Sequence, residues 1–312
     1  MTTEQKVLRL SIAVTVLLAG AGILFGLLSG SFAIVFDGIY SLVDASMTTV
    51  TLLVSNLIAA STATLSTGGP RRGKLAERFT MGFWHPEPMV LGLNATLLMG
   101  AAIYALINAV GSLMTGGRDL AFDPAIVYAA VTVLVAAGMA VFATRANRTV
   151  RSDFLALDAK AWIMSAALTA ALLVAFVFGH LIQGTRLQWV SPYIDPAALA
   201  LVCLVVIPIP VGTMRQALAD VLLVTPADLK RHVDAVASDI VGRHGFISYR
   251  AYVARVGRGR QIELFFSVPR GWPPRTLEVW DGIRDEVGAA IGGEGPDRWL
   301  TIVFTSDPEW AE

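Results

Sequence analysis

The chain has 312 residues, a formal net charge of zero and a single cysteine, and 55% of its residues are hydrophobic. Its mean hydropathy of +0.63 is too high for a typical soluble domain of this length. Zero net charge gives no general attraction to nucleic acid, and the lone Cys203 excludes an intrachain disulfide and a thiolate metal cluster. The composition therefore indicates an integral membrane protein.

Apolar stretches long enough to cross a bilayer, which takes about 20 residues, recur along the first part of the chain. They predict six membrane-spanning helices, at 9–29, 32–60, 88–114, 123–144, 157–183 and 195–219. Short connections make spans one and two, and spans three and four, antiparallel hairpins. We therefore expect a six-span transmembrane domain over residues 1–224 and a separate soluble domain over residues 225–312.

Basic residues in short loops set the orientation of a membrane protein. Here they gather at the N-terminus and after spans two and four, whereas the opposite side carries only Arg118 and Arg186. The gathered residues are Lys6, Arg9, Arg71, Arg72, Lys74, Arg78, Arg145, Arg148 and Arg151. This asymmetry predicts that both termini are cytoplasmic. No targeting extension precedes the first span, which favours a bacterial inner membrane.

Span six is interrupted by Pro208 and Pro210. Each proline removes a backbone donor and can kink a helix. The interruption is either a functional bend or a packing accommodation that neighbouring helices satisfy.

From Pro226 onward the pattern becomes that of a soluble domain. It predicts a helix, two strands, a second helix and a last strand, at 227–243, 247–256, 261–268, 273–291 and 299–304. Two helices on one face of such a sheet form a small open-sheet α+β domain. His232 and His244 lie in and just after the first helix without other ligands nearby, so we interpret them as surface histidines.

Acidic side chains within the spans carry the functional prediction. Asp37, Tyr40 and Asp44 are spaced so that they share one face of span two, and Asp158 lies in span five. A carboxylate at the centre of a span costs about 2.5–3.5 kcal/mol on insertion scales, and a bound cation would offset that cost. The pattern predicts a cation site at Asp44 and Asp158, with a structural hydrogen-bond network as the alternative.

The neighbouring polar residues each admit more than one role. Tyr40 would supply a neutral oxygen or a hydrogen bond, because a phenol ionises near pH 10, and Asp37 would extend the pathway or bond to another helix. Amide and hydroxyl oxygens that could contact the ion come from Asn94, Asn108 and Ser165. His85 and Glu87, at the mouth of span three, would form a charge latch, an entry point or a solvated cluster.

The available ligands limit the ion. Zinc sites favour His and Cys in tetrahedral geometry, whereas the spans offer mainly oxygen, apart from His180 near the far end of span five. Oxygen ligands suit Mg²⁺ and Mn²⁺ and tolerate Fe²⁺. We expect a hard divalent cation as cargo, without distinguishing Mn, Fe, Mg, Co and Zn, and no resident cofactor.

With these residues in place, the chain resembles the cation diffusion facilitator family, which exports divalent cations in exchange for protons. The resemblance covers nearly the whole length. It rests on the span-two acids, on the segment FTMGFWHPEP with Phe79, Gly82, His85 and Glu87, and on Asp195-Pro196 at the start of span six. It implies six spans, cytoplasmic termini, a ferredoxin-like cytoplasmic domain and a homodimer formed through that domain.

Departures from the family pattern concern its metal ligands. Tyr40 stands where the family usually has His or Asp, and span five pairs Asp158 with Trp162, whose indole is only a donor and cannot bind a metal. In the soluble domain, Phe265 and Phe304 occupy positions that bind zinc in many members. That domain would then dimerise by packing alone, through some of Phe265, Phe266, Trp280 and Trp299.

The sequence therefore predicts a divalent-cation efflux transporter, proton-coupled as the resemblance implies. One alternative is an organic or monovalent cargo held over Trp162 by a cation–π contact. Another is a transport-inactive or regulatory relative with a degenerate metal site. An enzyme is not expected, because the spans hold no nucleophile–base pair, phosphate-binding loop or H-E-x-x-H motif.

Overall fold

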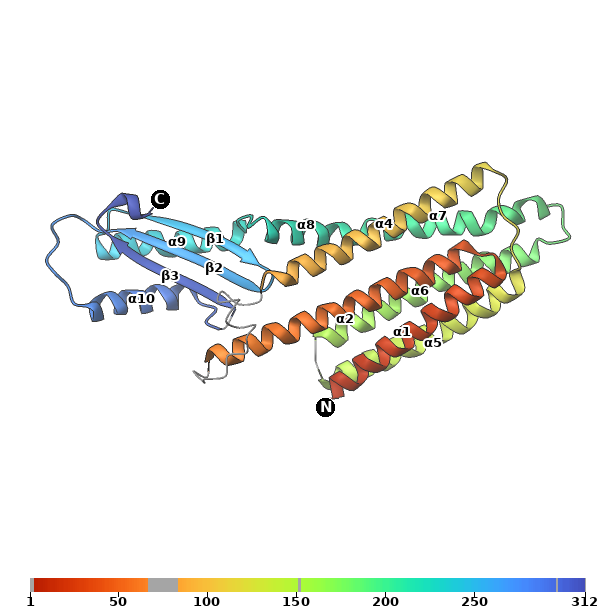
Figure 1. The fold of residues 1–312 in the computed structure, drawn as a ribbon, viewed down its shortest axis with the longest axis horizontal. Helices are drawn as coiled ribbons and strands as arrows, with labels where there is room; N and C mark the ends of the chain where they lie inside the picture. The colour runs from red at the N-terminus through yellow and green to blue at the C-terminus, as the bar shows by residue number, and fades with distance from the viewer. Residues whose placement is uncertain (1–2, 67–83, 151–152, 296, 312) are drawn as a thin grey trace. The chain divides into compact units, whose positions relative to one another are not determined.

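The structure is a computed structural model that describes residues 3–66, 84–150, 153–295 and 297–311 (Figure 1). Some features used above lie outside the described residues. These are Phe79 and Gly82 of the span-three motif and the basic residues Arg71, Arg72, Lys74, Arg78 and Arg151. The orientation that those basic residues indicate stays a prediction.

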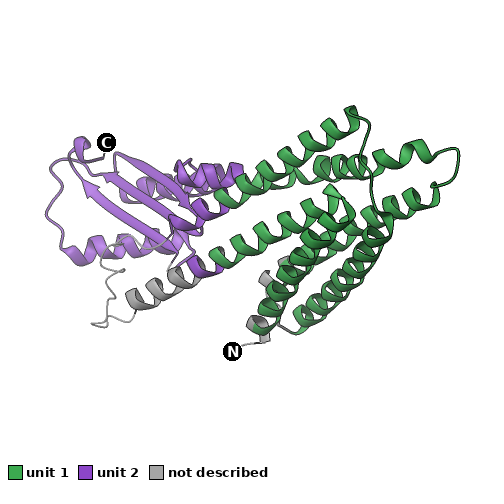
Figure 2. Cartoon of the chain, turned by 45° about the vertical axis from the view of Figure 1, so that its right-hand side comes forward, with its two compact units in different colours: residues 1–50, 93–213 green, residues 51–92, 214–312 purple. Residues whose placement is uncertain are grey.

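The chain forms two compact units (Figure 2). The first consists of Met1–Val50 and Leu93–Thr213, and the second consists of Thr51–Gly92 and Met214–Glu312. The division of the sequence into domains at residue 224 stays a prediction.

The transmembrane part is entirely helical. Its elements are α1 (Thr3–Ser29), α2 (Phe32–Ser66), α4 (Pro86–Met114), α5 (Phe122–Val150), α6 (Asp153–Leu181), the 3₁₀ helix η1 (Gln188–Tyr193), α7 (Ile194–Val206) and α8 (Ile209–Val221). Within the described residues, six helical stretches are long and apolar enough to cross a membrane, the last of them running through η1, α7 and α8. The prediction of six spans is confirmed.

Helices α1 and α2 approach each other at glycine. A methyl group on Gly38 of α2 would lie 2.8 Å from the carbonyl oxygen of Ala19 and 2.9 Å from the backbone nitrogen of Ile23, both in α1. On the α1 side, a methyl on Gly22 would lie 3.2 Å from the Cα of Gly38. Only glycine permits this contact, because the neighbouring atoms are backbone. The contact holds the acidic stripe of α2 directly beside α1.

Asp195 at the start of α7 caps the N-terminus of α2. Its carboxylate accepts hydrogen bonds from Ser31 Oγ at 2.5 Å and from the backbone N–H of Phe32 at 3.0 Å. These bonds satisfy N–H groups that have no partner within the helix. Asp195 is only 2% exposed, and the guanidinium of Arg118 lies over the Phe32 ring at 3.6 Å. The start of α2 is thus fixed by a residue of span six.

Span six is broken rather than merely bent. Helix α7 ends at Val206 and α8 begins at Ile209, with Pro208 between them. Pro208 and Pro210 have no N–H to donate to the carbonyls of Leu204 and Val206, four residues earlier. The break therefore frees backbone carbonyls from their usual helical partners.

The C-terminal elements follow the predicted α-β-β-α-β order. They are α9 (Ala227–His244), β1 (Ser248–Val256), β2 (Gly259–Ser267), α10 (Leu277–Ile291) and β3 (Arg298–Thr305), followed by the 3₁₀ turn η2 (Pro308–Ala311). Strand β2 lies between β1, antiparallel to it, and β3, parallel to it. This is a three-stranded form of the expected ferredoxin-like α+β domain.

One expected boundary was wrong, because α10 begins at Leu277 and not at Pro273. Thr276 precedes the helix with an extended backbone, and the prolines at 273 and 274 lie outside it. A residue that precedes a proline is disfavoured in the helical region, so Pro273, followed by Pro274, is a poor first helical residue.

Both helices pack on one face of the sheet around a common apolar core. Helix α9 contributes Val233 and Ile240, α10 contributes Val287, and the sheet contributes Leu264 and Phe266. Each of these five side chains is fully buried. Burying one such side chain stabilises the fold by about 1.5–3 kcal/mol.

Aromatic rings fill much of this core. Phe304 of β3 packs on Trp280 of α10, with ring centroids 4.7 Å apart, and on Phe266 at 5.7 Å. Phe246 contacts the same rings. Phe265 points to the opposite sheet face, where its edge meets Tyr252 at 5.9 Å.

The position of each aromatic side chain decides whether it could contact a second subunit. Phe266 is a core residue with 0% exposure and offers nothing to a partner. Trp299 is 38% exposed and shares the outer sheet face with Phe265, as their register along β2 and β3 shows. The dimer itself stays a prediction.

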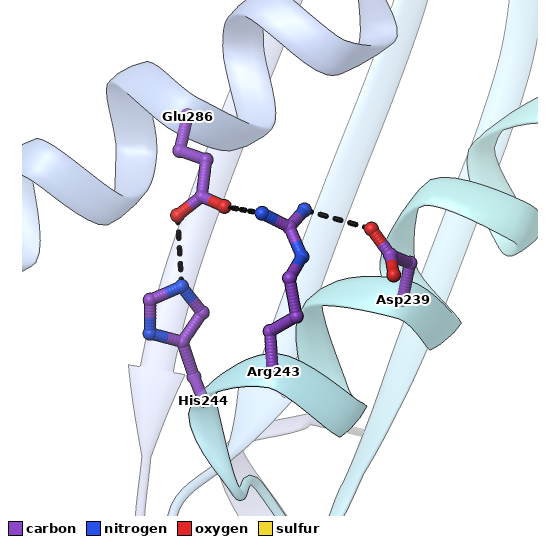
Figure 3. Close-up of polar contacts among 4 residues, drawn as sticks. All are labelled: Asp239, Arg243, His244 and Glu286. Carbon is purple, nitrogen blue, oxygen red and sulfur yellow. Dashed lines mark hydrogen bonds and ion pairs between the residues drawn. The ribbon is translucent and has the colours of Figure 1, made fainter.

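Polar side chains link the two helices of this domain (Figure 3). Arg243 pairs with Asp239 at 2.8 Å and with Glu286 of α10, and Nε2 of His244 lies 2.8 Å from the second Glu286 oxygen. His232 Nε2 lies 3.1 Å from the carbonyl oxygen of Ile291. His232 is exposed, as predicted, and His244 is half-buried. Each also contacts α10.

Candidate cation-binding cavity

A cavity of about 340 Å³ lies inside the first unit, with walls from α1, α2, α4, α5, α6 and the α7–α8 break. It brings together seven of the residues that the sequence predicts for the site. These are Asp37, Tyr40, Asp44, Asn94, Asp158, Trp162 and Ser165. Asn108 is not among the lining residues and bonds instead to the Tyr104 carbonyl of its own helix.

The α2 wall carries the predicted acidic stripe. Because α2 is continuous from Phe32 to Ser66, the spacing of Asp37, Tyr40 and Asp44 places all three on the cavity side. The Asn94 amide lies within hydrogen-bonding reach of Asp44, and the Tyr128 hydroxyl lies within reach of Asp37. Neutral donors thus stand beside both carboxylates of the stripe.

Asp158 is held by a chain of two hydrogen bonds that runs from α6 to α1 and back. The indole N–H of Trp162 donates to Ser11 Oγ at 2.8 Å, and Ser11 Oγ donates to Asp158 Oδ1 at 2.6 Å. The other oxygen, Oδ2, is buried and has no hydrogen-bond partner among the described residues. Trp162 therefore orients Asp158 through Ser11.

Sequence reasoning missed Ser11. A single serine in an apolar N-terminal span has no periodic pattern to single it out, and its partner lies 147 residues away in the chain. The available signal was indirect: a buried indole N–H needs an acceptor, and Trp162 lies one helical turn from Asp158.

Span six contributes its broken segment to the wall. Val206, Ile209, Pro210 and Thr213 all line the cavity. The carbonyl of Val206 is one of those that a proline four residues later leaves without a helical donor. In membrane proteins such irregular backbone is tolerated where it lines a cavity, so the break belongs to the site.

The usual nitrogen and thiolate ligands of zinc do not appear on this wall among the described residues. Within the part of the chain that the structure describes, no histidine, cysteine, lysine or arginine lines the cavity. No three or more His, Cys, Asp or Glu side chains, in those same residues, are arranged to hold a metal ion. Lys160 is exposed on another face, and His180 pairs with Asp123 at 3.4 Å.

His85 and Glu87 belong to the second unit and take no part in the cavity. Glu87 accepts two bonds from the Arg258 side chain, from Nε and Nη2, each at 3.1 Å, and a third from the Arg258 backbone N–H at 3.3 Å. These bonds raise the pKa of Arg258 above its usual value. Arg258 lies in the β1–β2 turn beside Gly257, where a methyl group would lie 2.8 Å from the Glu87 carboxylate. Of the roles expected for Glu87, this geometry favours the charge latch.

A second ion pair from the same hairpin reaches α8. Arg255 of β1 donates to Asp220, near the end of α8, at 3.0 Å. Asp220 is 5% exposed. Within the second unit, the β1–β2 hairpin is therefore bonded both to the first turn of α4 and to the last turn of α8.

The comparisons with known proteins decide the family. Residues 8–222 match the family model of the cation efflux transmembrane domain, which is well over half of the chain. The chain belongs to the cation diffusion facilitator family. Comparison with curated proteins gives no match.

Family membership settles the broad function. The chain is a cation efflux transporter and an integral membrane protein, from a family of transporters rather than enzymes. The cavity lies within the residues matched by the family model.

Proposed function

We propose that this chain exports a hard divalent cation in exchange for protons, and that Asp44 and Asp158 bind the ion in the cavity. One observation carries the proposal: carboxylates from two different spans, α2 and α6, line the same cavity. Two carboxylates balance a charge of +2, and oxygen is the ligand that Mg²⁺ and Mn²⁺ prefer.

The coupling follows from competition at the same oxygens. A carboxylate that holds a proton has lost the charge that binds the ion, so protons arriving from the outer side release the cation there. The protons then return with the inward movement and leave as the next ion binds. The Oδ2 atom of Asp158, buried and without a partner among the described residues, is the atom at which both compete.

The arrangement of Trp162 speaks against the organic-cation alternative. A cation–π contact needs a free ring face, but Trp162 is 5% exposed and packs with Ala136, Met139 and Ala140. Its N–H is also engaged with Ser11.

We further propose that the chain works as a homodimer with cytoplasmic termini in a bacterial inner membrane. The Lys and Arg asymmetry of the loops supports the orientation. The outer sheet face with Phe265 and Trp299 supports association by packing alone.

The test uses the purified full chain in liposomes with an acidic interior. Uptake of Mg²⁺, Mn²⁺, Fe²⁺, Co²⁺ and Zn²⁺ is followed together with the pH of the interior. We expect uptake of a hard cation with proton release. Asp44→Asn and Asp158→Asn should each abolish uptake. The matched control is Asp123→Asn, an exposed aspartate of α5 outside the cavity, which should transport normally.

Uptake that survives either cavity substitution would refute the assignment of the site. If correctly folded protein takes up none of the five ions, the transport-inactive or regulatory alternative replaces the proposal.

A further inference from the structure

The cavity has more room than a bare ion needs. Its volume is about 340 Å³, and a water molecule takes up about 30 Å³ in the liquid. The space thus corresponds to on the order of ten water molecules. A divalent ion stripped of water and chelated by the protein would leave most of this volume to be filled by something else.

The acids are also too dispersed to surround an ion. Asp37, Asp44 and Asp158 all line the cavity, yet among the described residues no three acidic, histidine or cysteine side chains are placed to ligate one metal. Complete replacement of a hydration shell takes six or more oxygen ligands for hard cations. The carboxylates supply charge, but they do not supply a full coordination sphere.

Hydroxyl groups make up much of the remaining polar wall. They include Ser41, Thr48, Thr132 and Thr213. A hydroxyl both donates and accepts hydrogen bonds, so it binds a metal-bound water, which is a strong donor, better than it replaces a carboxylate as a metal ligand.

Three buried polar atoms on the wall point to such a ligand. Asn94 Oδ1, Thr132 Oγ1 and Asp158 Oδ2 have no hydrogen-bond partner among the described residues. Thr132 is only 3% exposed, and its hydroxyl approaches Tyr128 without reaching hydrogen-bond geometry. Buried polar atoms normally have partners, and all three of these can accept a hydrogen bond from water.

We propose that the cation occupies the cavity as a partly hydrated ion, held mainly through its coordinated water by Thr132, Asn94 and the carboxylates. At most two protein oxygens replace water in its coordination sphere. This deepens the proposed function, on which it rests, and it sets the ligand class: divalent ions that dehydrate reluctantly, as Mg²⁺ does, rather than ions that take a closed tetrahedral shell of protein ligands, as Zn²⁺ does.

The experiment counts the waters on a bound ion. Mn²⁺ is added to the purified full chain, and electron–nuclear double resonance in H₂O and D₂O measures the exchangeable water ligands of the bound Mn²⁺. We expect about four or more of six positions to be water.

Two threonines of the wall provide a matched pair of variants. Thr132→Val removes the hydroxyl that has no described protein partner, whereas Thr15→Val removes one that donates to the Ser11 carbonyl of its own helix at 3.0 Å. Both substitutions keep the shape of the side chain. We expect Thr132→Val to weaken Mn²⁺ binding about three- to tenfold, the loss of one hydrogen bond, and Thr15→Val to change it less than twofold.

The outcomes separate this inference from the proposed function. One outcome is that bound Mn²⁺ carries three or fewer waters and that Asp158→Asn abolishes its binding. That result would overturn partial hydration but would still support the carboxylate site. Equal effects of the two threonine variants would also overturn partial hydration. Absence of Mn²⁺ binding, or binding unchanged in Asp158→Asn, would overturn both proposals.

Discussion

Replacing Ser11 by alanine tests whether the hydrogen-bond chain positions Asp158. The Ser11 hydroxyl is 3% exposed, accepts from Trp162 at 2.8 Å and donates to Asp158 at 2.6 Å. Ser11→Ala removes both bonds and leaves the shape of the backbone and the charge of the site unchanged. The carboxylate then loses the contact that directs its second oxygen, Oδ2.

The size of the effect of Ser11→Ala depends on Asp158 and Trp162, which each lose a hydrogen-bond partner. A hydrogen bond to a charged group contributes about 1.5–3 kcal/mol. Part of this is recovered, because Asp158 lines a cavity with room for water. We therefore expect a loss of binding free energy at the lower end of this range. Because about 1.4 kcal/mol corresponds to a tenfold change in affinity, the ion should bind roughly tenfold more weakly. The buried indole N–H recovers less, so protein stability should fall by about 1–3 kcal/mol.

Two measurements check this. Binding of Mn²⁺ to the variant gives the affinity, and the indole ¹⁵N–¹H resonance of Trp162, assigned from its loss in Trp162→Phe, reports whether the bond is broken. Ser11→Thr keeps a hydroxyl and should restore much of the affinity. The double variant Ser11→Ala/Trp162→Phe should bind no more weakly than Ser11→Ala alone, because Trp162 acts through Ser11.

The reasoning fails if the Trp162 resonance shifts in Ser11→Ala while Mn²⁺ affinity stays within twofold of the original. The bond would then be lost without consequence for the ion, and Ser11 would have a structural role only.

Other predictions follow from contacts elsewhere in the molecule. Glu87→Gln should lower the free energy of unfolding of the full chain by about 1 kcal/mol, because it weakens a partly buried ion pair. An unchanged Tm at low salt would contradict a latch between Glu87 and Arg258. Phe304→Ala should destabilise the C-terminal domain by about 3 kcal/mol, and Phe265→Ala should destabilise it by much less. A chelator should leave the Tm of both variants unchanged. The opposite order of the two variants in urea unfolding would show that the core was misassigned. Gly38→Ala should cost about 1–3 kcal/mol through its clash with the α1 backbone, whereas Gly20→Ala, with no atom within 4 Å of the added methyl, should be tolerated in the same thermal assay.

The α2 side of the site was predictable because helical periodicity is a local property. Once the span was recognised, the spacing of Asp37, Tyr40 and Asp44 placed them on one face without knowledge of any other helix. On the α6 side, the acidic residue could be predicted but its hydrogen-bond partner could not. Asp158 was evident as an acid in an apolar span, but its bond to Ser11 depends on how α1 packs against α6, which no local pattern contains.

The soluble domain shows the same division. Alternating and amphipathic patterns predicted the order of its helices and strands, because burial of one face dictates those patterns. The parallel pairing of β2 with β3 and the packing of Phe304 on Trp280 were not contained in those patterns. Adjacent residues such as Phe265 and Phe266 differ only in which face they take, and that depends on register.

The tryptophan in span five illustrates why the loss of a metal ligand differs from the loss of a site. Trp162 cannot coordinate an ion, yet its N–H reaches Asp158 through Ser11 and fixes which carboxylate oxygen remains unpaired. A buried carboxylate is costly unless it is paired, so an abandoned site has no reason to keep Asp158 or a donor chain that orients it. With fewer direct ligands the ion must find its remaining coordination elsewhere, and the hydroxyl-lined volume around Asp158 offers water for that purpose. In the proposed site, positioning by Trp162 and hydration of the ion thus both follow from having an indole where a direct ligand would otherwise stand.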